Sequence, residues 1–202
     1  MSSALDFYFD FSSPYGYFAS TRIDELAKDL GREARWHPVL LGPIFKATGM
    51  APLVQIPLKG EYSRRDMTRT ARLHQIPFDM PEPFPIATVA AARIMLHLDQ
   101  GDPDMAKAYA RRAFEAYYVR GVNIGEPAHA LQLVSDLGLD RERIGQAIAT
   151  DAVKALLREA NDAALARGVF GSPFVIVDDE PFWGFDRLEA VRMWARATAA
   201  GA

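Results

Sequence analysis

The sequence predicts one α/β domain built from both ends of the chain, with an all-helical domain inserted between them. Three observations favour this fold class. Residues 5–11 alternate between apolar and polar side chains, which is typical of a strand. The middle of the chain is rich in Ala, Leu, Arg and Glu and is broken by Gly, Pro and Asp, which is typical of successive helices. Short β-rich runs return after Gly168.

The opening of the chain predicts a strand, a helix and a second strand. Ser13 and Pro14 follow the first strand directly, and a Ser cap with Pro in the first helical position is a strong helix start. An apolar helical face ends at Gly31, and residues 35–41 predict the second strand. In the first strand, the apolar face is Leu5, Phe7, Phe9 and Phe11, and the other face is Asp6, Tyr8 and Asp10.

The middle of the chain predicts a bundle of antiparallel helices. Gly and Pro at 101–103 and 125–127, and Gly138, separate stretches that are rich in Ala, Leu, Arg and Glu. We expect this inserted helical domain to cover residues 46–167. The helical stretches are 87–100, 104–120, 128–138 and 140–166.

The end of the chain returns to a β-rich pattern that completes the first domain. We expect residues 168–202 to join residues 1–45 in one layered domain, because strands at both ends flank the helical section. The predicted elements are a strand at 174–177, a turn at 178–181, a strand that begins at Phe182, and a final helix over about 186–199.

Composition excludes several classes of protein. The 202 residues carry 23 Lys and Arg against 26 Asp and Glu, a net charge of −3, which argues against a nucleic-acid-binding protein. The chain has no cysteine, so it has no disulfide, no protein thiol and no dithiol redox couple. We expect no metal site, since the four histidines are widely scattered. With neither a signal peptide nor a membrane-spanning stretch in the pattern, we expect a soluble cytoplasmic protein.

Two positions could carry chemistry. Ser13 lies where the first strand meets the first helix; it is either a plain N-cap or a hydroxyl aimed at an anionic group near the helix N-terminus. A serine-hydrolase role is disfavoured, because no G-x-S-x-G surrounds it and no His can be assigned as its base. Pro173, after Gly171 and Ser172, is either an ordinary strand-entry residue or a cis-proline facing a ligand.

These motifs, in this order, resemble those of the 2-hydroxychromene-2-carboxylate isomerases, relatives of the kappa-class glutathione transferases. The resemblance implies a thioredoxin-like fold in which Ser13-Pro14-Tyr15-Gly16 replaces the C-P-x-C of disulfide oxidoreductases and Pro173 is the cis-proline. The matching stretches are DFYFDFSSPYGYFAS (6–20), PVLLGPIFKATG (38–49), PLKGEYSRRD (57–66), GVFGSPFVIV (168–177) and FWGFDRLE (182–189).

The resemblance implies glutathione as cofactor and assigns it a set of residues. The hydroxyl of Ser13 would hydrogen-bond the glutathione sulfur and favour the thiolate, since only about 3% of a free thiol is ionised at neutral pH. The backbone of Ser172 would pair with the cysteinyl part of glutathione. The remaining implied contacts are Tyr15, Pro173, Lys59 for the glycine carboxylate, and Asp186 for the γ-glutamyl ammonium, where helix capping is the other interpretation.

Two positions depart from the family pattern. The resemblance leads us to expect Asn at Met50 and Asn or Ser at Phe185, both in contact with glutathione. Neither Met nor Phe makes such side-chain hydrogen bonds, although the backbone groups of both residues remain able to do so. The sequence therefore predicts weaker glutathione binding, to be restored by Met50→Asn with Phe185→Asn.

The substrate side of the site is less defined. Lys46, beside Phe45, is a candidate partner for a substrate carboxylate. A basic stretch at helical spacing is either a solvated helix face or an attractor of an anionic substrate. That stretch is Arg64, Arg65, Arg69 and Arg72, and the aromatic residues that could be core or platform are Trp36, Trp183, Phe45 and Phe84.

The implied function is glutathione-dependent interconversion of 2-hydroxychromene-2-carboxylate and trans-o-hydroxybenzylidenepyruvate, in the breakdown of aromatic compounds by a homodimer. The thiolate would add to the double bond of the opened enone, and rotation and elimination would return the thiol. A kappa-like glutathione transferase or peroxidase is the first alternative. A non-catalytic thioredoxin-fold binding module is the second, and the absence of cysteine excludes a disulfide oxidoreductase.

Overall fold

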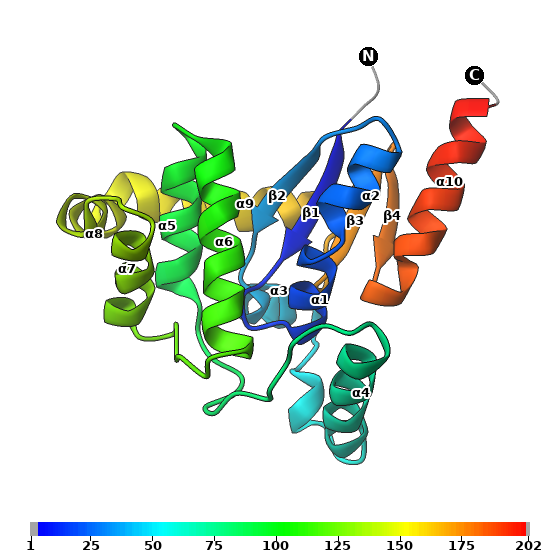
Figure 1. The fold of residues 1–202 in the computed structure, drawn as a ribbon, viewed down its shortest axis with the longest axis horizontal. Coiled ribbons are helices and arrows are strands. Elements are labelled where there is room, and N and C mark those ends of the chain that lie inside the picture. The colour runs from blue at the N-terminus through cyan, green and yellow to red at the C-terminus, as the bar shows by residue number, and fades with distance from the viewer. Residues whose placement is uncertain (1–3, 201–202) are drawn as a thin grey trace.

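The computed structural model describes residues 4–200 and contains a four-stranded mixed sheet of order β2-β1-β3-β4 (Figure 1). Strands β1 (Leu5–Phe9) and β2 (Ala34–Pro38) are parallel. Strand β3 (Phe174–Val177) is antiparallel to β1 and to the edge strand β4 (Glu180–Trp183). The predicted α/β fold class is confirmed, because strands from both ends of the chain form one sheet.

Helices cover both faces of the sheet (Figure 1). Helices α1 (Pro14–Ser20), α2 (Ile23–Asp29) and α10 (Leu188–Ala200) pack on one face. Helices α3 (Leu41–Thr48) and α9 (Asp151–Ala166) pack on the other, where Ile44 and Ala164 join the side chains of β1 and β3. The sheet is thus buried on both sides, which is the usual arrangement in α/β proteins.

The predicted helical stretches of the middle section are present, with one correction. The stretch 140–166 forms two helices, because Thr150 has an extended backbone (φ −69°, ψ 152°) and its hydroxyl caps the second helix by accepting from the Val153 N–H. Helices α5 and α6 lie side by side next to the sheet, with α7 and α8 farther from it (Figure 1). The helices besides α9 are α5 (Val89–Asp99), α6 (Pro103–Tyr118), α7 (Pro127–Asp136) and α8 (Arg141–Ala149).

Several boundaries differ from those predicted. The first strand ends at Phe9 and not at residue 11, and the last strand begins at Glu180, inside the predicted turn. The helix after Ser13 is two short helices, because the chain breaks at Thr21 and Arg22 before α2 ends near Gly31, which has φ +65°. The second strand ends at Pro38, three residues before the predicted end. The last helix is preceded by a 3₁₀ turn, η2 (Phe185–Arg187).

A further segment links the sheet to the helical section. A 3₁₀ turn, η1 (Leu53–Gln55), follows α3, and the basic stretch forms helix α4 (Lys59–Leu73), as its spacing predicts. Helix α4 stands apart from α5–α9 (Figure 1). No helix within residues 4–200 has the length and hydropathy needed to span a membrane.

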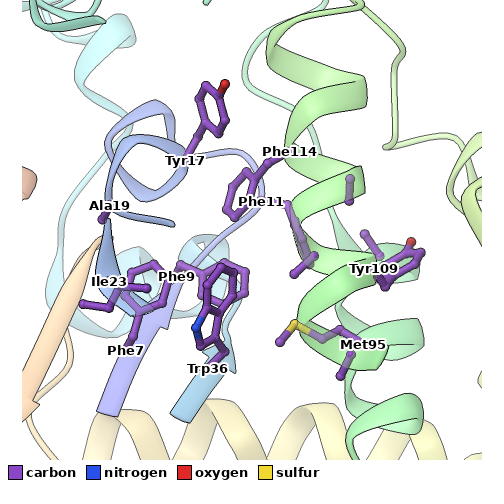
Figure 2. Packing of buried hydrophobic residues seen from close by; sticks show 14 of the residues in the cluster. Phe7, Phe9, Phe11, Tyr17, Ala19, Ile23, Trp36, Met95, Tyr109 and Phe114 are labelled. Carbon is purple, nitrogen blue, oxygen red and sulfur yellow. The ribbon is translucent and has the colours of Figure 1, made fainter. Parts of the chain in front are cut away.

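The larger core cluster lies between β1, β2 and helices α1 and α6 (Figure 2). The rings of Phe9 and Phe11 lie 5.3 and 5.2 Å from that of Phe114 on α6, so the end of β1 packs directly on the helical section. Trp36 is 4% exposed and is therefore a core residue, whereas Trp183 is 47% exposed. The apolar face of β1 thus fixes the strand end from which Ser13 follows.

Candidate active site

Ser13 connects β1 to α1 and is almost fully buried, with 5% of its surface exposed. Its backbone is extended (φ −102°, ψ 111°) and its hydroxyl oxygen accepts the Gly16 N–H at 3.0 Å, which confirms the N-cap. The same hydroxyl donates its proton to the carbonyl of Ser172 at 2.9 Å. Ser13 is therefore both a helix cap and the direct link between the start of α1 and the loop before β3.

The loop before β3 contains the predicted cis-proline. The Ser172–Pro173 peptide bond is cis. The carbonyl of Pro173 accepts the Gly184 N–H at 3.0 Å, and the Ser172 hydroxyl oxygen accepts the Asp10 N–H at 3.1 Å. Ser172 is thus held through its carbonyl by Ser13 and through its side chain by the end of β1.

Asp10 lies beneath this junction and joins three elements. Its carboxylate accepts the N–H of Ser12 at 2.8 Å, the N–H of Leu41 at 2.7 Å and the hydroxyl of Thr88 at 2.7 Å. Burial raises the pKa of the Asp10 carboxyl, and these three hydrogen bonds act against that rise. Asp10 therefore fixes the loop after β1 against the start of α3 and the residue before α5.

Gly16 is required by the close approach of two side chains. A Cβ atom at this position would lie 2.8 Å from the Ser172 hydroxyl oxygen and 3.2 Å from that of Ser13. Any side chain here would separate α1 from the cis-proline loop. The sequence pattern identified Gly16 only as part of a motif and Asp10 only as a member of the polar face of the first strand.

Tyr15 points toward helix α4. Its hydroxyl donates to Asp66 at 2.5 Å, and Arg69 forms an ion pair with the same carboxylate. Burial raises the pKa of Tyr15, and the hydrogen bond to Asp66 adds to that rise. The hydroxyl of Tyr15 is thus committed to Asp66 and anchors α4.

The other predicted site residues lie on the surrounding surface, with one exception. Phe185 is buried, 7% exposed, and its ring packs edge-on against Phe18 of α1 and His74 at the end of α4. Its side chain is therefore part of the core. The exposed residues are Lys46 in α3, Met50 after it, Lys59 at the start of α4, and Asp186, which pairs with Arg187 at 3.6 Å. Within residues 4–200 no hydrogen bond or ion pair joins these four to Ser13 or Ser172.

The arginines of α4 lie on one exposed side of the helix. Arg64, Arg65, Arg69 and Arg72 line one open surface hollow together with Thr68 and Leu73. Arg65 pairs with Glu61 at 2.6 Å. The four cations are thus exposed to solvent, as both interpretations of the basic stretch require.

Comparison with known proteins first defines the class of protein. Residues 4–193 match the DSBA-like thioredoxin domain family. The chain is 32% identical over 187 residues to a 2-hydroxychromene-2-carboxylate isomerase of Pseudomonas sp. (strain C18), covering 91% of this chain and 86% of that protein. It is 26% identical over 197 residues to glutathione S-transferase kappa 1 of Rattus norvegicus, covering 92% and 87%.

A solved structure agrees with these sequence matches. The crystal structure of a 2-hydroxychromene-2-carboxylate isomerase superposes with a TM-score of 0.85 at 29% identity, covering 99% of this chain and 100% of that one. The chain therefore belongs to the 2-hydroxychromene-2-carboxylate isomerase family within the DSBA-like thioredoxin-fold proteins. It is an enzyme of that type.

Proposed function

We propose that this enzyme is a glutathione-dependent isomerase that interconverts 2-hydroxychromene-2-carboxylate and trans-o-hydroxybenzylidenepyruvate. The observation that carries the proposal is the buried Ser13 hydroxyl, hydrogen-bonded to the residue before cis-Pro173 in a chain without cysteine. Relatives named for the isomerisation support the substrate class, and kappa-class relatives support a glutathione site.

The residues at the junction fit glutathione. Ser13 and Ser172 supply hydroxyl groups, and the first turn of α1 contains no acidic side chain that would repel a thiolate. The exposed Lys59 and Asp186 have the charges needed by the carboxylate and ammonium ends of the tripeptide. When bound, glutathione supplies the thiol nucleophile that the chain itself lacks.

Ser13 is the residue that acts on the thiol. A hydroxyl donor near a sulfur favours its ionised form. To donate to sulfur, Ser13 must turn its proton away from the Ser172 carbonyl. Lys46, exposed on α3, would hold the substrate carboxylate.

A kappa-like transferase or peroxidase is the alternative favoured by the 26% identity to glutathione S-transferase kappa 1. The two functions differ in stoichiometry. An isomerase returns every thiol it uses, whereas a transferase or peroxidase consumes glutathione in proportion to product. Product formation with no loss of free thiol supports the isomerase, and equimolar thiol loss supports the alternative.

Ser13→Ala tests the assignment directly. We expect the fold to remain, stability to fall by about 1–2 kcal/mol for the lost cap and hydrogen bond, and turnover to fall severely. The pH–rate profile should move to higher pH, because the bound thiol loses a donor to its ionised form. Full activity with an unshifted profile would exclude this role. Stoichiometric acylation of Ser13, blocked by substrate, would point instead to a covalent serine mechanism.

The two departures from the family pattern, Met50 and Phe185, have different surroundings and cannot be tested by one double variant. Because Phe185 is buried, Phe185→Asn would damage the core, and the double variant is no longer a useful test. Met50 is 38% exposed, so Met50→Asn alone tests the predicted contact. We expect it to tighten glutathione binding by about one hydrogen bond, up to roughly tenfold, measured by calorimetry. No gain would mean that the side chain at this position does not contact glutathione.

Three further parts complete the proposal: the homodimer comes from the resemblance, and the location and domain division come from the sequence pattern. We propose a homodimer in the cytoplasm, and a division of the chain into a glutathione-binding domain of residues 1–45 and 168–202 and a helical domain of residues 46–167. The sheet built from both ends of the chain supports this division. Sedimentation at several protein concentrations tests the dimer.

A further inference from the structure

The Ser13–Ser172 junction contains two hydroxyl groups, and their protons are used differently. A serine hydroxyl has one proton to donate. Ser13 donates its proton to the Ser172 carbonyl at 2.9 Å. Within residues 4–200, the Ser172 hydroxyl accepts the Asp10 N–H at 3.1 Å and makes no hydrogen bond as a donor. Of the two hydroxyl groups, that of Ser172 is therefore the one free to donate a hydrogen bond to a ligand.

The two hydroxyl oxygens face a common point. Both lie within 3.2 Å of the position that a Cβ on Gly16 would take, with Ser172 Oγ at 2.8 Å. Ser172 is partly exposed, whereas Ser13 is almost fully buried. The two hydroxyl oxygens are at most 6.0 Å apart, the sum of those two distances, so one sulfur atom can lie within hydrogen-bonding distance of both.

The environment of Ser172 strengthens its hydroxyl as a donor. A hydroxyl that accepts a hydrogen bond is polarised and donates a stronger one. The Asp10 N–H provides that bond from the rigid end of β1, and Asp10 is itself fixed by Ser12, Leu41 and Thr88. The Ser172 hydroxyl is therefore both polarised and held in place.

We propose that the side-chain hydroxyl of Ser172 is a second catalytic donor to the sulfur of the bound thiol cofactor. This rests on the proposed glutathione dependence. Two neutral donors share the stabilisation of one thiolate, and the role is separate from that of the Ser172 backbone, which any residue before the cis-proline could provide. Chains with an aliphatic residue at this position would rely on Ser13 alone.

The test measures the pKa of bound glutathione from the ultraviolet absorbance of its thiolate, without turnover. Ser172→Ala should raise that pKa by about one unit toward the free value of about 8.5, because hydrogen bonds to charged groups are worth that much. Ser172→Thr, which keeps a hydroxyl, should titrate like the unaltered enzyme. Below the bound pKa, where the neutral thiol binds, glutathione affinity should change less than twofold in either variant. At high pH, where the thiolate binds, affinity should fall about tenfold in Ser172→Ala and stay unchanged in Ser172→Thr.

Ser12→Ala is the matched control. The Ser12 hydroxyl also accepts one distant backbone N–H, that of Ile86 at 3.0 Å, so its removal disturbs the fold in a similar way. We expect no change in the thiol pKa from this variant. A shift as large as that of Ser172→Ala would show a general disturbance and overturn the proposal.

The outcomes separate this proposal from the proposed function. If Ser13→Ala raises the thiol pKa and Ser172→Ala does not, Ser172 is no donor and the glutathione function stands. If the unaltered enzyme binds no glutathione, both fail. Should Ser172→Ala not fold, the structure of the unaltered enzyme with glutathione decides. A sulfur beyond hydrogen-bonding distance of Ser172 Oγ overturns the proposal.

Discussion

Asp6 and Asp10 lie four residues apart on the same face of the first strand segment, yet their surroundings are opposite. The Asp6 carboxylate contacts two basic side chains, His37 at 2.9 Å and Arg167 at 2.7 Å. Asp10 contacts only neutral donors. Burial alone raises the pKa of Asp6, but the hydrogen bonds and charges of His37 and Arg167 outweigh it and lower the pKa to about 2. For Asp10, burial prevails and the pKa rises.

The difference shows how one strand serves two purposes. Near its start, Asp6 links β1 to β2 through His37 and to Arg167, the residue after α9. At its end, Asp10 fastens three backbone segments without placing a cation near the candidate site. Because the Asp10 carboxylate is held by neutral N–H and O–H donors, it organises the loop around Ser13 without a cation that would compete for a bound anion.

The largest expected effect comes from Asp10→Ala. It would leave the N–H groups of Ser12 and Leu41 without their acceptor, and each buried unsatisfied donor costs about 1–3 kcal/mol. We expect a loss of about 3–5 kcal/mol in urea unfolding. Asp10→Asn, which keeps one accepting oxygen, should lose less. A loss below about 1 kcal/mol for Asp10→Ala would mean that the carboxylate does not organise this junction.

The pH dependence of stability should sharpen the contrast. The folded pKa of Asp6, about 2, lies below the ordinary value of 3.8. The ionised carboxylate therefore adds its whole contribution to the free energy of unfolding above about pH 4, and this contribution is lost as the pH falls toward 2. The folded pKa of Asp10 lies above 3.8, so its contribution is full below that value and lost as pH rises through the folded pKa.

These signs can be measured as differences between the unaltered protein and Asp6→Asn or Asp10→Asn. The Asp6 difference should grow by about 1–2 kcal/mol between about pH 2 and pH 5, after allowance for solvent screening. The Asp10 difference should shrink with rising pH. Two curves of the same sign would show that the carboxylates share one environment.

The smallest expected effect comes from Tyr8→Phe on the same strand face. The Tyr8 hydroxyl accepts a hydrogen bond from Arg167 at 2.6 Å, and its loss should reduce stability by about 1 kcal/mol. The ring remains to stack on His37, with centroids 4.7 Å apart. A loss as large as that of Asp10→Ala would mean that the interactions of Arg167 and His37 with β1, and not the hydrogen bonds of Asp10, contribute most to the stability of the sheet.

Local patterns predicted what depends on neighbours in sequence. The alternation of residues 5–11 predicted the first strand and both of its faces, although the strand ends at Phe9. Ser13 and Pro14 predicted the helix start, and the spacing of the arginines predicted α4. The cis-proline came from the family resemblance and is confirmed.

Long-range partners could not be predicted in this way. The alternation placed Asp10 on a polar face, but its acceptor role depends on Leu41 and Thr88, which are 31 and 78 residues away. The bond between Tyr15 and Asp66 joins two elements 51 residues apart. The break at Thr150 had a local signal, a Thr followed by Asp151, that the long apolar periodicity outweighed.

The sheet order has a consequence for folding during synthesis. The bond from Ser13 to Ser172 spans 159 residues, and β1 pairs with β3 only after nearly the whole chain has been made. At about 5–20 residues per second, the first strand waits on the order of 10–30 s on the ribosome for its neighbour. During that interval one edge of β1 is open to other chains. Ser13 and Ser172 therefore meet only late in synthesis, and a truncated nascent chain that ends before Ser172 contains Ser13 without its hydrogen-bond acceptor.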